Sequence, residues 1–343
     1  MSYVIGSFNL RDFGDGAIQS RDLVKIAEII KNEKFDVVAL QEIFNEGNAF
    51  INNNVIKYEL GDEWEFQWAD AENEKFHHEG YGYLWNKRRL GLAKDNGKPF
   101  QPRIWEKPSI KGLIKRPPFF ARFTPVESLL GGPYFELRLI CIHTFFGSGQ
   151  EIDVLLRNFE IETVLTEIYT DIEDIQYNSM PSYTFVLGDY NVQLKRAWKE
   201  STIRDNAPYL EADANDVMLA EEYVAGELIR VKKIITVQDQ LTTLKKPKKD
   251  GETGSLTYQG GYAHDYDHFS YNLDRFSGVN LKWKRIDAVK EYFNGDYKLY
   301  HEKVSDHIPI SMEMELRGIS NFDLTSLTTI TEAVQEDYKE LRN

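Results

Sequence analysis

The stretch "FVLGDYN", Phe185 to Asn191, begins as a buried strand would and ends in polar side chains. Its first three residues are apolar and strand-prone, whereas Asp189 and Asn191 carry a carboxylate and a carboxamide. In an extended chain, side chains two residues apart point the same way, so these two groups are expected to face one region beyond the strand. Glycine, aspartate and asparagine are also ordinary turn residues. Alone, the stretch leaves a polar turn and a functional site as equal alternatives.

The sequence around this stretch alternates between strand and helix patterns. Val4–Asn9 and "FDVVALQE" read as strands, and between them Arg21–Lys31 has apolar residues at helical spacing. A second helix is predicted at Ile152–Ile168. Further strands are predicted at Tyr81–Asn86, Phe119–Val126, Tyr134–Phe146 and "YTFVLGDYN", and near Tyr266 and Ile310. This order predicts an α/β protein with helices packed outside its sheets.

Two segments look like additions to that core. The stretch from Lys195 to Arg230 is mixed and helix-prone, and no chemistry is assigned to it. The polar tail from Arg317 to Asn343 is predicted to contain a helix between Thr328 and Leu341. The tail either binds a protein partner or packs back on the domain, and the sequence does not decide between the two.

The composition indicates a folded protein outside the membrane. Of the 343 residues, 42% are apolar and 13% aromatic, which is enough for a substantial core. No apolar run approaches the ~20 residues that cross a bilayer, and the N-terminus lacks the pattern of a signal peptide. Cys141 is the only cysteine, which excludes an intramolecular disulfide and a cysteine-based metal site. We therefore expect a cytoplasmic protein.

The charge balance limits how the protein could act on phosphates. Its 41 basic and 55 acidic residues give a formal net charge of −14, which argues against binding a polyanion by general attraction. A bound cation or a local basic patch would then be needed. The only dense basic run is "LKKPKKDGETG", Leu244 to Gly254, which reads either as a solvated loop or as a phosphate-facing loop, with the first reading favoured.

Polar residues of a few types follow the predicted strands. They are Asn9, Glu42, His143, Asp189, Asn191, Asp267, Asp306 and His307. Carboxylate and carboxamide oxygens suit Mg²⁺ or Ca²⁺, and histidines paired with carboxylates suit proton transfer. A core histidine with a satisfied hydrogen bond explains either histidine alone but explains both poorly. The set indicates metal-assisted hydrolysis of a phosphate ester.

An ordered series of motifs carries a family resemblance. It runs "SFNLRDFG", "VVALQE", "EGYGYLW", "RPPFFARF", "ICIHT", "LGDYN", "YDHF" and "VSDHIPI". The series resembles the endonuclease/exonuclease/phosphatase superfamily, and most closely its deoxyribonuclease I-like nucleases. The resemblance implies a four-layer α/β sandwich, in which helices flank two mostly antiparallel sheets. It assigns residues 1–316 to one catalytic domain, with an insertion around 195–230 and the tail at 317–343.

The resemblance also implies a metal and a phosphate-binding set. Glu42 is the expected principal ligand of a divalent ion, with Asn9 and Asp306 in supporting positions. The expected ion is Mg²⁺, with Mn²⁺ and Ca²⁺ as alternatives. Asn191 and Arg116 are the residues expected to contact the substrate phosphates.

The same resemblance implies the groups that move protons. His143 and His307 are the expected catalytic histidines, paired with Glu79 and Asp267 respectively. Asp189 is expected to orient or deprotonate the attacking water. His307 and Asp189 both remain candidates for the general base.

Departures from the motifs affect the predicted substrate. "LQE" is followed by "IFNEG" without the arginine that deoxyribonuclease I-like enzymes place in the minor groove, and His77 and His78 precede Glu79 where relatives have an aromatic residue. The prediction is a nuclease acting on DNA, with RNA second, and these departures leave its preference for single or double strands open. The alternatives are an enzyme acting on a phosphoinositide, a sphingolipid or a nucleotide, and a non-catalytic binding module.

Overall fold

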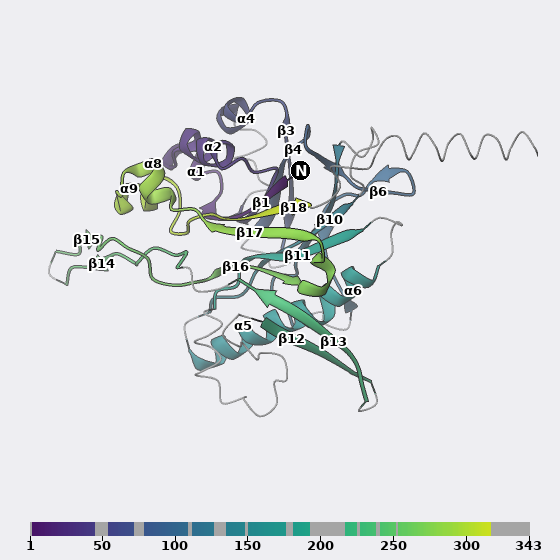
Figure 1. Cartoon of the computed structure of the whole chain (residues 1–343). Coiled ribbons are helices and arrows are strands. Elements are labelled where there is room, and N and C mark those ends of the chain that lie inside the picture. The colour runs from purple at the N-terminus through teal and green to yellow at the C-terminus, as the bar shows by residue number, and fades with distance from the viewer. Residues whose placement is uncertain are drawn as a thin grey trace, which may run out of the picture.

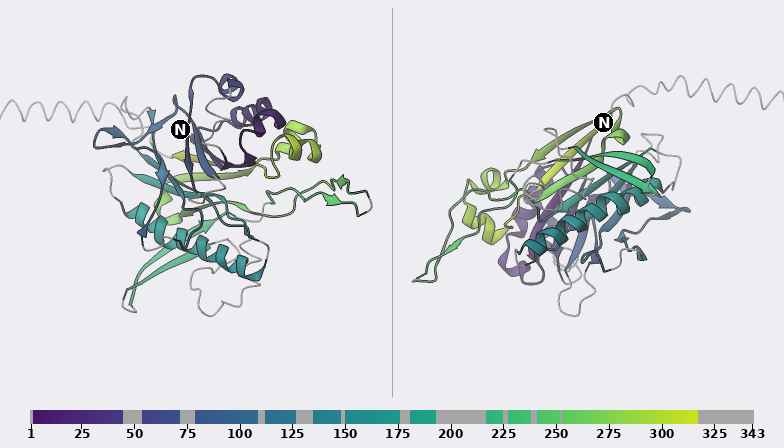
Figure 2. Two further views of the ribbon diagram at one scale, coloured as in Figure 1. Left: turned by 180° about the vertical axis from the view of Figure 1, so that it is seen from behind. Right: turned by 90° about the horizontal axis from the view of Figure 1, so that it is seen from below.

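Two β-sheets packed face to face form the centre of the molecule, and helices lie on their outer sides (Figures 1 and 2). The structure is a computed structural model. It describes residues 2–44, 54–71, 79–108, 112–126, 135–147, 150–175, 181–192, 217–224, 227–237, 241–251 and 253–316. The predicted tail and the residues His77 and His78 lie outside these ranges.

The first sheet has six strands in the order β17-β18-β1-β2-β4-β3. Its strands are β1 (Ser2–Phe13), β2 (Val37–Ile43), β3 (Trp64–Asp70), β4 (Gly80–Asn86), β17 (Val279–Arg285) and β18 (Ile310–Leu316). Only β1 and β2 are parallel, because a helix connects them, and the other neighbours are antiparallel.

The second sheet follows the order β12-β13-β16-β11-β10-β9-β5, with β8 beside β9. Its strands are β5 (Leu90–Leu92), β8 (Arg103–Ile104), β9 (Phe119–Pro125), β10 (Glu136–His143), β11 (Ser182–Asp189), β12 (Val217–Val224), β13 (Glu227–Thr236) and β16 (Asp267–Asn272). β10 and β11 are parallel and the other pairs antiparallel. Two small hairpins lie outside the sheets: β6 (Lys94–Asp95) with β7 (Lys98–Pro99), and β14 (Lys248–Lys249) with β15 (Leu256–Thr257).

Helices pack on the outer face of each sheet. Those of the first sheet are α1 (Ala17–Ser20), α2 (Leu23–Asn32), α4 (Asn54–Leu60), α8 (Ala288–Phe293) and α9 (Tyr297–Lys303). Those of the second are α5 (Glu151–Thr163), the π-helical turn Val164–Ile168 and α6 (Tyr169–Asp174); a 3₁₀ turn spans Leu273–Phe276. α2 begins where it does because the Asp22 side chain accepts a hydrogen bond from the amide of Lys25 at 3.0 Å.

Three apolar clusters separate the layers. On β2, Val37 and Ala39 pack between the two sheets, whereas Val38 and Leu40 pack against the helices of the first sheet. This alternation is the two-residue period of a strand with both faces covered. A third cluster joins α5 and α6 to the far side of the second sheet. The predicted four-layer sandwich with mostly antiparallel sheets is therefore confirmed.

Some local predictions were wrong. The helix predicted at Ile152–Ile168 continues to Asp174 through the π-helical turn. The helix-prone stretch Lys195–Arg230 contains β12 and the beginning of β13 where it is described, because pairing of β13 with β16 outweighs the local helix preference. Within the described ranges, no helix combines the length and apolar character needed to cross a bilayer.

Candidate active site

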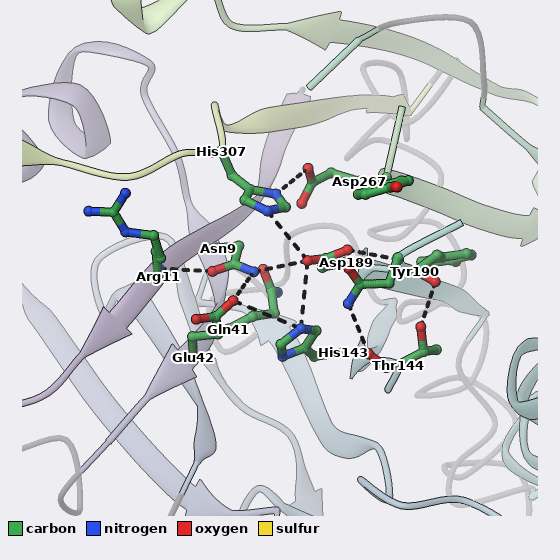
Figure 3. Close-up of polar contacts among 12 residues, drawn as sticks. Asn9, Arg11, Gln41, Glu42, His143, Thr144, Asp189, Tyr190, Asp267 and His307 are labelled. Atoms are coloured by element: carbon green, nitrogen blue, oxygen red, sulfur yellow. Dashed lines mark hydrogen bonds and ion pairs between the residues drawn. The ribbon is translucent and has the colours of Figure 1, made fainter. Parts of the chain in front are cut away.

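The ends of the central strands of both sheets meet at one rim of the sandwich. In the second sheet, His143 on β10 is aligned with Asp189 on β11, and Asp189 is aligned with Asp267 on β16. In the first sheet, Asn9 on β1 lies beside the end of β2, where Glu42 is found. Figure 3 shows these side chains pointing toward one another. The predicted convergence of polar residues at strand ends is what the structure shows.

Asp189 lies at the centre of this group and is 1% exposed. Its Oδ2 accepts a hydrogen bond from Asn9 Nδ2 at 3.0 Å and lies 3.6 Å from Nε2 of both His143 and His307 (Figure 3). Its Oδ1 accepts a hydrogen bond from the amide of Asn191 at 2.8 Å. Burial raises the pKa of this carboxyl, with the His307 imidazole opposing the shift. One carboxylate therefore links both histidines to the first sheet.

Gly188 lets β11 deliver Asp189 to this position. Its φ of 141° is in a region that other residues avoid, and a Cβ there would lie 2.0 Å from the carbonyl oxygen of Ile142 on β10. The motif "GDYN" therefore requires glycine for backbone reasons before any catalytic role is considered.

Asn191 differs from the geometry expected for an extended strand. β11 ends at Asp189, and Asn191 adopts a left-handed φ of 51°. Its Nδ2 donates a hydrogen bond to the carbonyl of Thr144 at 2.9 Å, and Arg157 donates to its carbonyl at 2.8 Å. "GDYN" is thus a turn and part of the site at once, because Asn191 lines the same cavity as Asp189.

Each histidine has a carboxylate on its Nδ1, as the resemblance implied. His307 Nδ1 lies 2.8 Å from Asp267 Oδ2, and His143 Nδ1 is hydrogen-bonded to Glu79. Burial alone would lower the pKa of His307, but Asp267 and Asp189 outweigh burial and hold this pKa well above its usual value. Glu79 likewise outweighs burial and raises the pKa of His143. Both imidazoles are therefore held as cations more firmly than free histidine.

Glu42 is held in place by two hydrogen bonds. Its Oε1 accepts from Asn9 Nδ2 at 2.8 Å and its Oε2 from the amide of Asp12 at 2.9 Å. Its own φ is 58°, a left-handed value at the bulge where β1 and β2 change register. Burial raises the pKa of its carboxyl, partly offset by His143. A largely buried acid with a raised pKa at this position would be stabilised as a carboxylate by a bound cation.

Two groups of side chains could hold a metal ion. Glu42, His143 and Asp189 form one, and Asp189, Asp267 and His307 form the other; within each group the ligand atoms lie within 4.8 Å of one another. In the second group His307 is already paired with Asp267. The first group lines the open cavity and has a partly exposed carboxylate, Glu42, so it is the better site. Its oxygens suit a hard divalent cation.

Unpartnered buried oxygens also fit a cation. Among the residues that the structure describes, Oδ1 of Asp267 and Oδ1 of Asp306 are buried without a hydrogen-bond partner. Asp306 lines the cavity but belongs to neither group of potential ligands, so its supporting role toward the metal stays a prediction. Arg116 also lines the cavity, where its guanidinium contacts Glu79 Oε2 at 2.7 Å.

A cavity of about 370 Å³ opens over these residues. Its remaining walls include Phe146, His264 and Tyr266, which the sequence did not point to, and Lys246 from the basic run. The rings of His264 and Tyr266 are stacked, with centroids 4.7 Å apart. The cavity therefore places polar side chains that could contact a phosphate next to aromatic side chains that could contact a base or sugar.

Supporting residues were also missed by sequence reasoning. Ser305 Oγ donates to the carbonyl of Asn9 at 2.7 Å and accepts from the amide of His307 at 3.1 Å, so it ties the segment that carries His307 to β1 at the rim. The hydroxyl of Tyr81 accepts from the amide of His143 at 3.1 Å. The only sequence feature that could have indicated these two residues is that Ser305 lies in the motif "VSDH" and Tyr81 in the motif "EGYGY".

The layers, the sheet order and the rim together define the endonuclease/exonuclease/phosphatase fold, and the prediction of this fold is confirmed. Among similar solved structures, ANGEL2, a 2′,3′-cyclic phosphatase in complex with adenosine-2′,3′-vanadate, has a TM-score of 0.53 at 13% identity, covering 93% of this chain and 96% of that chain. An endonuclease/exonuclease/phosphatase family protein from Bacteroides thetaiotaomicron has a TM-score of 0.50 at 12% identity, covering 93% and 99%. Humanized D. rerio TDP2 has a TM-score of 0.50 at 14% identity, covering 92% and 99%.

These similarities are structural. No protein-family model matches the sequence, and no curated protein sequence matches it. At such identities the likeness establishes the fold, and the chemistry has to be argued from the site itself.

Proposed function

We propose that this protein is a metal-dependent hydrolase of phosphodiesters, most specifically a nuclease. The observation that carries the proposal is the position of Asp189 between two carboxylate-paired histidines and beside Glu42. A site for water, a site for a cation and two imidazolium donors are thereby held within one cavity. These are the groups that in-line attack on a phosphodiester needs.

Glu42, with Asn9 holding its carboxylate, would be the principal ligand of the metal, and His143 and Asp189, which lie next to it, keep their roles as imidazolium and as proton acceptor. Mg²⁺ is the ion that the oxygen-rich set favours, with Mn²⁺ and Ca²⁺ as alternatives. When bound, the ion would supply positive charge against the charge that develops on the phosphate oxygens.

The protonation states assign roles to the remaining residues. His307 is favoured as imidazolium because two carboxylates face it, so it serves as a hydrogen-bond donor to a phosphate oxygen rather than as the base. Asp189 is more basic than an ordinary aspartate because it is buried, so it accepts the proton of the attacking water. Asn191 and Arg116, which line the same cavity, are assigned to the flanking phosphate oxygens.

The substrate we favour is DNA, with RNA second. The motifs "EGYGYLW" and "RPPFFARF" support a nuclease, and the ring wall of the cavity fits a nucleotide better than a bare inositol phosphate. ANGEL2, a 2′,3′-cyclic phosphatase, has the same fold, so a cyclic phosphodiester at a nucleotide terminus ranks after DNA and RNA. Lipid phosphoesters rank last.

A panel of substrates tests the proposal. Plasmid, single-stranded DNA, RNA, a 2′,3′-cyclic nucleotide, inositol phosphates and sphingomyelin are incubated with the protein and Mg²⁺, with and without EDTA. We expect cleavage of nucleic acid that EDTA abolishes. In Glu42→Gln the Mg²⁺ concentration for half-maximal activity should rise by at least about 10–100-fold, since losing an outer partner of a metal ligand already costs that much.

Three results would contradict parts of the proposal. Undiminished cleavage in EDTA would remove the metal from the mechanism. Phosphate release from inositol compounds with intact nucleic acid would replace the substrate class. Absence of turnover on every substrate, with Mg²⁺ binding retained, would favour a binding module over an enzyme.

A further inference from the structure

A long hairpin projects from the molecule beside the active-site rim. We call residues 245–262 the basic arm. Its tip is the small ladder of β14 and β15, in which Lys248 pairs with Thr257 and Lys249 with Leu256. The arm extends away from the sandwich below α8 and α9 in Figure 1, and the views of Figure 2 show the same projection. Because most of its described side chains are exposed, the extension adds little to the core.

The first five residues of the arm concentrate positive charge. Lys245, Lys246, Lys248 and Lys249 are all exposed and lie within five residues. Within the described part of the chain, none of the four has a carboxylate at ion-pair distance. Asp250 is instead engaged in the turn, where its Oδ1 accepts from the amide of Thr253 at 2.6 Å. The protein has a net charge of −14, so these four lysines form a local region of positive charge on a molecule that is negative overall.

The root of the arm is bonded to the catalytic segments. The amide of Leu244 donates to the carbonyl of Asp306 at 2.7 Å, and Thr243 forms a β-bridge with His307. Thr242 Oγ1 accepts from the amide of Asp267 at 3.2 Å. The arm therefore has a fixed origin at the catalytic rim, although its tip is far from it.

One lysine connects the arm to the cavity. Lys246 lines the cavity, and its Nζ lies 5.2 Å from the ring centroid of Phe146, which also lines it. Lys248 and Lys249 follow two and three residues further on, in β14. The positive charge thus forms a track that begins at the cavity and leads away from it.

We propose that the basic arm binds the phosphate backbone of a nucleic-acid strand on one side of the phosphodiester held in the cavity. This inference rests on the proposed function, because the strand is taken to be the substrate. Lysines neutralise successive phosphates without reading sequence, and the counterions they release make binding salt-dependent. An anionic membrane fits less well, because Leu256, 57% exposed, is the one large apolar side chain that the described residues of the arm expose to insert.

Matched double variants test the arm. Lys248→Gln/Lys249→Gln removes two charges from β14, and Lys94→Gln/Lys98→Gln removes two from the other small hairpin, on the opposite side of the molecule (Figure 1). Binding of a labelled single-stranded oligonucleotide is measured in EDTA over a range of salt. The slope of log affinity against log salt should decrease by about 1.4 in the arm variant, at about 0.7 per phosphate contact, and stay unchanged in the control. Lys248→Arg/Lys249→Arg should restore it.

Hydrolysis of a small diester, bis(p-nitrophenyl) phosphate, separates this inference from the proposed function. In the arm variant, activity on the oligonucleotide should fall relative to activity on the small diester, and in the control this ratio should not change. Equal salt slopes in all proteins would overturn the arm inference even if wild type cleaves the small diester. A reduced slope in the arm variant alone would support the inference even if wild type cleaves nothing. Arm-dependent binding to phosphatidylserine vesicles with no oligonucleotide binding would overturn it in favour of a membrane surface.

Discussion

The two ends of β10 carry buried charged groups that behave in opposite ways. At its beginning, Glu136 accepts hydrogen bonds from Arg122 Nε at 2.8 Å and from Arg138 Nε at 2.6 Å. At its end, about 23 Å further on, His143 faces Asp189 and Glu42 across distances of 3.6 and 3.9 Å. The first group is a closed ionic cluster, and the second is open toward a cavity.

The pKa shifts record the same difference. Burial opposes the Glu136 carboxylate, but two guanidiniums outweigh burial and lower its pKa below the usual value. At the other end, burial dominates and raises the pKa of both Glu42 and Asp189. A buried carboxylate supplied with enough positive charge is structural, whereas one short of positive charge can accept a cation or a proton. Burial of charge alone therefore does not identify a site.

The largest effect we expect comes from Asp189→Asn. The amide cannot accept the water proton, so turnover should fall by about 10²–10⁴-fold, the range for loss of a general base. The free energy of unfolding at neutral pH should not decrease, because the variant removes a buried carboxylate whose pKa is raised. Steady-state turnover and urea unfolding measure the two quantities. Loss of stability comparable to the loss of activity would place Asp189 with the structural cluster instead.

Glu136→Gln should reverse that result. Removing the charge leaves the buried guanidiniums of Arg122 and Arg138 without their shared carboxylate, and breaking a buried ion pair in this way costs about 3–5 kcal/mol. Urea unfolding should show this decrease, while the folded fraction keeps its turnover number and its Mg²⁺ requirement. A variant as stable as wild type but with reduced turnover would show that the two ends of β10 are coupled.

The sequence allowed the site to be predicted better than the arrangement around it. Asn9, Glu42, His143, Asp189 and His307 could be assigned because they follow apolar strands within recognisable motifs. The Glu136 cluster could not, because it depends on the register that places Arg122 beside Arg138, and nothing local to either strand specifies register.

Other elements were missed for different physical reasons. β13 becomes a strand through pairing with β16, a long-range contact that no local pattern reveals, and β12 joins the sheet by pairing with β13. α8 and α9 are short helices that begin at the capping aspartates Asp287 and Asp296, and their apolar faces are too brief for periodicity to show. The basic run was visible, but its root at the catalytic rim required the fold.

The smallest effect separates the two ends of β10 by pH. His307 has a folded pKa above its usual value near 6.5, so the stability it contributes is present below that pH and is lost as the pH rises through the folded value. Glu136 has a folded pKa below its usual value near 4.5, so its contribution to stability is present above that pH and is lost as the pH falls.

In EDTA, His307→Gln should flatten the decline in unfolding free energy above pH 6.5, and Glu136→Gln should flatten the decline below 4.5. Each change is at most about 1.4 kcal/mol per pH unit, the value for one proton. Urea unfolding across pH measures both, and identical curves for His307→Gln and wild type above pH 6.5 would mean that the carboxylates around His307 do not hold its proton.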